Sequence, residues 1–154
     1  MWIINIPGYY LPSGFHRDPG TNSVLIQIGD PVLCGDTNLV TEFPIPQFLF
    51  KETYQFRFLD MTDDNVDKLS LELQEVYTGG LFSDTQAQEI ASILVDAYNN
   101  KSNVIVHCSA GICRSGAVVE VGVMMGFEDI SNNRIPNLLV KRKLINQLMQ
   151  MEFL

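Results

Sequence analysis

One stretch of the sequence limits the fold more than any other: a short β-branched run, then a small polar segment, then a Val-rich stretch. The run Val104-Ile105-Val106 lacks polar alternation, which is typical of a strand buried on both faces of a sheet. The Val-rich stretch predicts a helix from Arg114 to Met125, closed by Gly126. We therefore expect a central strand that leads through a tight loop, Cys108 to Cys113, into a helix.

Two further helices are expected. Apolar residues recur at helical spacing from Ala87 to Tyr98, and Ser83 with Gln86 has the form of a capping box, which predicts a helix from about Asp84 to Asn99. A last helix should start near Pro136, because proline suits a first helical position. The apolar residues that it is expected to bury are Leu138, Leu144, Ile145 and Leu148.

Most prolines fall in the first third of the chain, which favours short strands and turns there. The best strand in that region is Ser23 to Ile28, and alternating apolar residues predict another from Gln55 to Met61, before an acidic turn at Thr62 to Asn65. Strands that alternate with helices predict an α/β fold with a central, largely parallel sheet flanked by helices, in a single domain spanning residues 1–154. Ligands of such sheets bind beyond the carboxyl ends of the strands.

Composition limits the partners. The chain has 18 acidic and 10 basic residues, which argues against binding nucleic acid or an anionic membrane through bulk charge. Its three cysteines, an odd number at irregular spacing, make neither a disulfide framework nor a paired metal site, so we expect reduced thiols in the cytoplasm. No apolar run approaches the roughly 20 residues of a membrane span. A soluble monomer is the simplest expectation.

The loop carries the residues whose side chains can take part in a reaction. Five residues separate the thiol of Cys108 from the guanidinium of Arg114, and Gly111 supplies the torsional freedom that a curled backbone needs. Inward-pointing amides and the planar guanidinium fork would bind a phosphate and stabilise a thiolate at Cys108. The residues expected to bind substrate are Ser109, Ala110, Gly111, Ile112, Cys113 and Arg114.

These residues suggest a two-step hydrolysis. Attack by the Cys108 thiolate on phosphorus would form a cysteinyl-phosphate, which requires neither metal nor cofactor. A carboxylic acid would protonate the leaving oxygen, and Asp64, or next Asp63, is placed for that role. Ser115 would hydrogen-bond the sulfur, while His107 is expected to orient the loop by bonding backbone groups.

The segment HCSAGICRSG resembles the HCxxGxxRS signature of the protein tyrosine phosphatase superfamily, particularly its compact, dual-specificity-like, prokaryote-type branch. LIQIGDP, FRFLDMTDD and LFSDTQAQEI resemble an early strand and turn, the acid loop and the helix that follows it in that family. The resemblance implies that Cys108 is the nucleophile, Arg114 the phosphate-binding residue and Asp64 the general acid. Because residues 65–80 look longer than in the smallest members, Asp60 and Asp63 remain candidates for the acid.

The resemblance implies a cysteine-dependent phosphatase for phosphate monoesters, acting on protein phosphotyrosine, on phosphoserine or phosphothreonine, or on a small phosphomonoester. The loop lacks the basic residues found in family members that act on inositol phospholipids. Two other functions stay open: a phosphoprotein-binding module that uses the same loop with little turnover, and a sulfur carrier of rhodanese type. Cys113 is expected to be a passive small residue, with trapping of oxidised Cys108 as the alternative, and Cys34 a free thiol.

Overall fold

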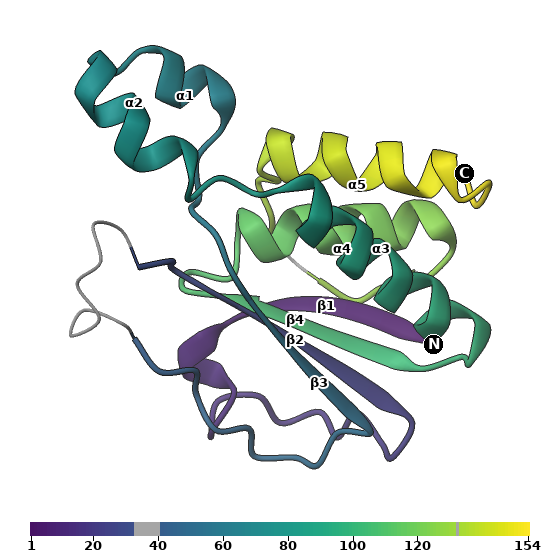
Figure 1. The fold of residues 1–154 in the computed structure, drawn as a ribbon. Coiled ribbons are helices and arrows are strands. Elements are labelled where there is room, and N and C mark those ends of the chain that lie inside the picture. The colour runs from purple at the N-terminus through teal and green to yellow at the C-terminus, as the bar shows by residue number, and fades with distance from the viewer. Residues whose placement is uncertain (33–40, 132) are drawn as a thin grey trace.

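The structure, a computed structural model, describes residues 1–32, 41–131 and 133–154, so the prediction for Cys34 lies outside the described residues. A five-stranded, all-parallel sheet runs through the described residues, in the order β3-β2-β4-β1-β5 (Figure 1). Its strands are β1 (Trp2–Pro7), β2 (Ser23–Gly29), β3 (Glu52–Arg57), β4 (Asn103–Cys108) and β5 (Glu128–Asp129). This arrangement confirms the predicted α/β class with a parallel sheet.

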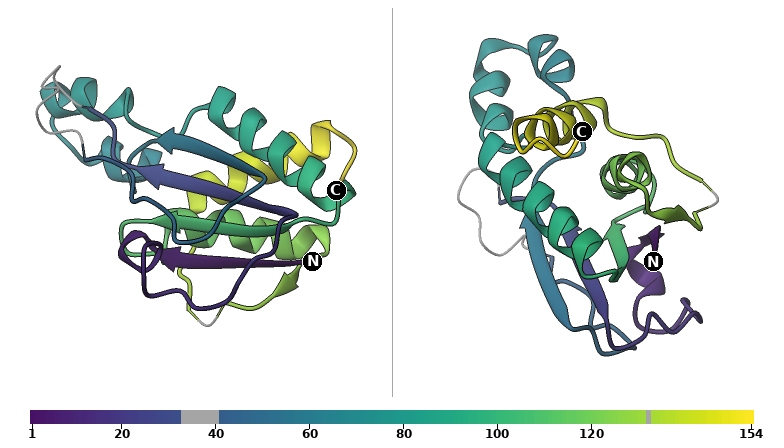
Figure 2. Two further views of the ribbon diagram at one scale, coloured as in Figure 1. Left: turned by 90° about the horizontal axis from the view of Figure 1, so that it is seen from below. Right: turned by 90° about the vertical axis from the view of Figure 1, so that its right-hand side faces the viewer.

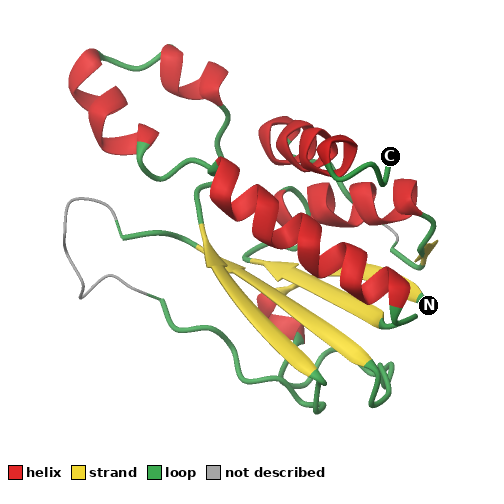
Figure 3. Ribbon diagram, turned by 45° about the vertical axis from the view of Figure 1, so that its right-hand side comes forward, coloured by secondary structure: helices red, strands yellow, loops and turns green. Residues whose placement is uncertain are grey.

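Strand β4 lies between β2 and β1, and Val104, Ile105 and Val106 are fully buried, as their lack of polar alternation predicts. Three helices, α3 (Asp84–Asn99), α4 (Arg114–Met125) and α5 (Leu138–Gln150), pack on one face of the sheet (Figures 1 and 3). Because side chains alternate along a strand, Val104, Val106 and Cys108 face these helices.

The opposite face of the sheet is covered by irregular segments (Figure 3). Leu11 and Phe15, which follow the 3-10 helix η1 (Gly8–Tyr10), pack on Ile6, Leu25 and Ile105. Phe48 and Phe50, from the connection that enters β3, add to the same cluster. The sheet is therefore buried on both sides, but its two coverings differ in kind.

Helices α1 (Asp63–Asp67) and α2 (Leu71–Thr78) project from the rest of the molecule, beyond the carboxyl ends of the strands (Figures 1 and 2). The predicted turn at Thr62 to Asn65 is instead the capping box that begins α1. Helix α2, which begins after the Ser70 cap, was not predicted. Among the described residues, no helix is long and apolar enough to cross a membrane.

Helices α3 and α4 have the predicted bounds, and Gly126 follows α4 with a positive φ of 120°. Three other predictions need correction. Strand β3 covers Glu52–Arg57 rather than Gln55 to Met61, because the N–H of Leu59 bonds the carbonyl of Gly80, which turns the chain out of the sheet.

The start of the last helix is the second correction. Helix α5 begins at Leu138, and not at Pro136, because the Asn137 side chain caps it by accepting a hydrogen bond from the N–H of Val140. The third concerns its apolar face. Leu144 and Leu148 are buried and Ile145 is half-buried as expected, whereas Leu138 is 69 % exposed because it lies on the outer side of the first turn.

Candidate active site

The segment between β4 and α4 folds back on itself, which is possible because Gly111 has a positive φ of 71°. A Cβ at this position would lie 2.2 Å from the backbone nitrogen of Pro7, so a side chain has no space there. The loop therefore packs directly on the end of β1. Ser109 and Ala110 are exposed, while Ile112 and Cys113 are half-buried.

The thiol of Cys108 lies at the end of the buried strand, and its Sγ is 3.2 Å from Oγ of Ser115 in the first turn of α4. Both residues are buried. Among the described residues, no side chain caps α4: Cys113 stands at the cap position and makes no side-chain hydrogen bond to the helix. The amides of the first turn are thus left without a side-chain partner beside the sulfur, an arrangement that favours an anion.

Arg114 is 5 % exposed, and two groups fix its guanidinium. Nη1 donates to Oδ1 of Asp30 at 2.6 Å and to the carbonyl of Phe58 at 2.9 Å. Nε and Nη2 make no hydrogen bond with the described residues. One edge of the fork is therefore anchored, and none of the described residues occupies the other edge, whose geometry suits two phosphate oxygens.

Asn5 in β1 holds the loop from behind. Its Nδ2 donates to the carbonyl of Gly111 at 2.6 Å and to the carbonyl of Asn133 at 2.9 Å. Because the C=O and N–H of a trans peptide point in opposite directions, this bond turns the N–H of Ile112 away from Asn5. A buried side chain from a neighbouring strand thus sets the direction of a loop amide.

His107 is 2 % exposed, and neither ring nitrogen has a hydrogen-bond partner among the described residues. Among the described residues, the predicted hydrogen bond to a backbone group is therefore not formed with good geometry, although the Cys108 backbone lies near enough to raise the pKa of the ring. Burial, with the charge of Arg114 acting in the same direction and the Cys108 backbone against it, lowers the pKa of His107 to about 4. The imidazole is uncharged at neutral pH.

The three candidate acids lie in different surroundings. Asp60 reaches the loop: its Oδ1 accepts a hydrogen bond from Asn137 Nδ2 at 3.0 Å, and its carboxylate lies close to the Cys113 thiol. Burial first, and then Asp60, raises the pKa of Cys113. Asp63 instead pairs with Arg142 of α5, at 3.0 Å, and this hydrogen bond lowers the pKa of Asp63.

Asp64 occupies the first turn of α1, where it is exposed and makes no hydrogen bond or ion pair with the residues that the structure describes. Carboxylates in the first turn of a helix interact favourably with the helix dipole. This interaction is a structural reason for the acidic pair Asp63 and Asp64. The structure thus brings Asp60 to the loop and turns Asp63 toward α5.

Sequence reasoning assigned no role to Asp30 or Asn5. Asp30 follows directly on β2, at the same edge of the sheet as Cys108, so its position after the strand was a usable signal. Asn5 carries no comparable signal, because its role depends on the pairing of β1 with β4. In the sequence, Asn5 stands out only as a polar residue within an otherwise apolar strand.

Comparison of the chain with protein-family models, with curated proteins and with solved structures gave no match.

Proposed function

We propose that this chain is a cysteine-dependent phosphatase that hydrolyses phosphate monoesters through a cysteinyl-phosphate. The observation that carries the proposal is the curled loop, in which the Cys108 thiol, the uncapped start of α4 and the free edge of Arg114 converge. We also propose that the fold is of the dual-specificity-like phosphatase type, on the strength of the HCSAGICRSG segment at this loop.

In the first step, the sulfur of Cys108 attacks phosphorus, the S–P bond forms and the bond from phosphorus to the leaving oxygen breaks. Loop amides and Arg114 stabilise the charge on the three equatorial oxygens. Asp60 donates a proton to the leaving oxygen, since it is the candidate acid that lies beside the loop.

In the second step, the Asp60 carboxylate takes a proton from water as the water oxygen attacks phosphorus. The S–P bond breaks, and inorganic phosphate and the Cys108 thiolate are released. The Ser115 hydroxyl, 3.2 Å from Sγ, donates a hydrogen bond to the departing sulfur. Substrate specificity between phosphotyrosine, phosphoserine and phosphothreonine depends on the surroundings of this loop.

The test is release of phosphate from para-nitrophenyl phosphate by the purified chain, with a chelator present. We expect turnover by the unmodified chain and none by Cys108→Ser, because an alcohol in this position is a far weaker nucleophile. Equal turnover by Cys108→Ser would refute the proposal. Tight binding of a phosphopeptide without any hydrolysis by the unmodified chain would favour the binding-module function instead.

A further inference from the structure

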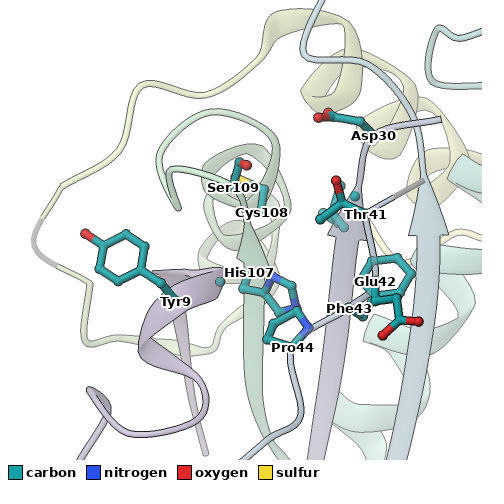
Figure 4. Close-up of a pocket in the computed structure, with 12 residues that line it drawn as sticks. Tyr9, Asp30, Thr41, Glu42, Phe43, Pro44, His107, Cys108 and Ser109 are labelled. Atoms are coloured by element: carbon teal, nitrogen blue, oxygen red, sulfur yellow. The ribbon is translucent and has the colours of Figure 1, made fainter. Parts of the chain in front are cut away.

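The cavity of about 310 Å³ beside Cys108 and Ser109 (Figure 4) belongs to the proposed active site. A separate groove of about 370 Å³ lies between strand β3 and the outer side of α3. A smaller hollow of about 90 Å³ continues this groove toward the start of β3, and the two share Tyr54 and Ile93. We call them together the β3 groove; none of the described residues that line it belongs to the catalytic loop.

Strand β3 borders the groove with a backbone edge that is open to another strand. Within the described part of the chain, β3 pairs with β2 on one side and with no strand on the other, and Figure 2 shows it at the edge of the sheet beside α3. Alternate residues of an edge strand direct their N–H and C=O groups away from the sheet. The middle of β3, Thr53 to Phe56, has no charge and no proline that would block pairing. An extended peptide can therefore continue the sheet at this edge.

Apolar side chains form the floor of the β3 groove. Tyr54 and Phe56 alternate along the strand on the side of the sheet that faces the helices, and Ile93 of α3 lines the groove with them. The Tyr54 hydroxyl donates a hydrogen bond to the carboxylate of Glu52, which fixes the tyrosine ring. Every second side chain of an added strand would point to the same side of the sheet and pack on this floor.

The rim of the groove is acidic. Its charged residues within the described ranges are three carboxylates, Glu52, Glu89 and Asp96, and one ammonium group, Lys51. None of the three carboxylates forms an ion pair with a residue that the structure describes. Glu89 and Asp96 are both exposed on α3, and Glu89 lines the larger hollow while Asp96 lines the smaller one. Negative charge therefore stands at both ends of the apolar floor.

We propose that the β3 groove is a docking site for an extended segment of a partner protein in which basic residues flank apolar ones. The segment pairs with β3 through its backbone, its apolar side chains pack on Tyr54 and Phe56, and its basic side chains reach Glu89 and Asp96. A second copy of this chain fits the groove less well, because its net charge is −8. Docking at this surface does not depend on the proposed catalysis.

Equilibrium binding of short peptides to the unmodified chain tests the proposal. The probe is the acetylated and amidated peptide Lys-Thr-Val-Thr-Val-Thr-Lys, which places both valines between both lysines on one face of a strand. The matched peptide has glutamate in place of each lysine. We expect the lysine peptide to bind about tenfold more tightly, and the difference to shrink at high salt. Titration by nuclear magnetic resonance measures both dissociation constants.

Methyl groups on the peptide nitrogens test whether the segment binds as a strand. Methylation of the three threonines and methylation of the two valines remove N–H donors from opposite edges of the peptide. Only one edge of an added strand faces β3, so one of the two methylated peptides should lose binding and the other should keep it. Equal binding of the two methylated peptides would contradict strand addition.

Charge reversal locates the site on the chain. Glu89→Lys combined with Asp96→Lys should reverse the preference, so that the glutamate peptide binds more tightly than the lysine peptide. Glu72→Lys combined with Glu75→Lys, at two exposed positions of α2, changes the net charge equally and should keep the original preference. Failure of the unmodified chain to bind the lysine peptide, or an unchanged preference after reversal of Glu89 and Asp96, would overturn the docking site. A dimer of the chain that pairs through β3 would also overturn it, and none of these results would affect the phosphatase proposal.

Discussion

The two halves of the proposed active site are held in contrasting ways. The loop half, Cys108 to Ser115, is tied by a buried hydrogen bond to Asn5 of β1 and by a partly buried ion pair to Asp30 after β2. The acid half, Asp60 to Asp64, lies on an exposed connection to the projecting α1 and α2 (Figure 1). The loop, whose function depends on amide directions, is held from the core through Asn5, whereas the proton donor lies on an exposed segment and is held there by the Asn137 side chain.

The largest effect should come from removing the loop's torsional freedom. Gly111→Ala introduces a Cβ 2.2 Å from the Pro7 nitrogen, at a residue with a positive φ. The loop must then open, and its amides no longer point toward one bound anion. We expect kcat/KM for para-nitrophenyl phosphate to fall about 10³-fold or more. Gly79→Ala, at a position with open space and an ordinary φ, is the control and should keep full activity. Near-normal activity in Gly111→Ala would show that the loop half is less constrained than we argue.

The acid half is tested by comparing two carboxylates. Asp60→Asn should lower turnover of an alkyl phosphate by about 10²–10⁴-fold, and much less for para-nitrophenyl phosphate, whose leaving group needs no proton. Asp64→Asn should change either rate by no more than about threefold. If Asp64→Asn alone gives the leaving-group-dependent loss, the original prediction for Asp64 holds and Asp60 only packs against the loop.

Acid should weaken the fold through His107. Its pKa is lowered from 6.5 to about 4, so between these values the unfolded chain binds a proton that the folded chain does not. Stability present above pH 6.5 is therefore lost as the pH falls, by about 2 kcal/mol at pH 5. Urea unfolding at pH 7 and pH 5 measures this difference.

His107→Gln should remove most of this dependence on pH. Asp63, whose pKa is also lowered, acts with the same sign but only below its ordinary value of 3.8, so Asp63→Asn should not change the difference in stability between pH 7 and pH 5. The same loss of stability in His107→Gln as in the unmodified chain would assign the acid sensitivity to other groups.

The smallest expected effect concerns the anchor of Arg114. Asp30→Asn keeps the shape of the side chain and removes the charge that holds Nη1, so the free edge of the guanidinium should drift. We expect kcat/KM to fall about tenfold, mainly through weaker binding of phosphate. Asp84→Asn removes an exposed ion pair with Lys143 and should leave kcat/KM unchanged. An unchanged KM in Asp30→Asn would mean that the Phe58 carbonyl alone positions the arginine.

The sequence was informative where structure is local. Helices α3 and α4 and the buried strand β4 follow from caps, a closing glycine and a β-branched run, all within a few residues of each element. The loop between Cys108 and Arg114 was predictable for the same reason. Local signals did not suffice everywhere, because the Thr62 and Ser70 caps begin α1 and α2, which were not predicted.

Elements that depend on residues far away along the chain were not predicted correctly from the sequence. The end of β3 is set by the bond between Leu59 and Gly80, and the start of α5 by the Asn137 side chain, which also reaches Asp60. The anchors Asn5 and Asp30 lie 106 and 84 residues from their partners in the loop. Sequence spacing carries no information about such contacts, which is why the acid was the least predictable part of the site.

The central claim is that the backbone from Ser109 to Arg114 surrounds a bound phosphate. It is tested most directly by titrating the Cys108→Ser chain with inorganic phosphate while observing its amide signals by nuclear magnetic resonance. We predict that the amides of this segment shift together along one saturation curve, and that Arg114→Ala abolishes the shifts. Unchanged signals in this segment, or shifts confined to other surfaces, would contradict the account.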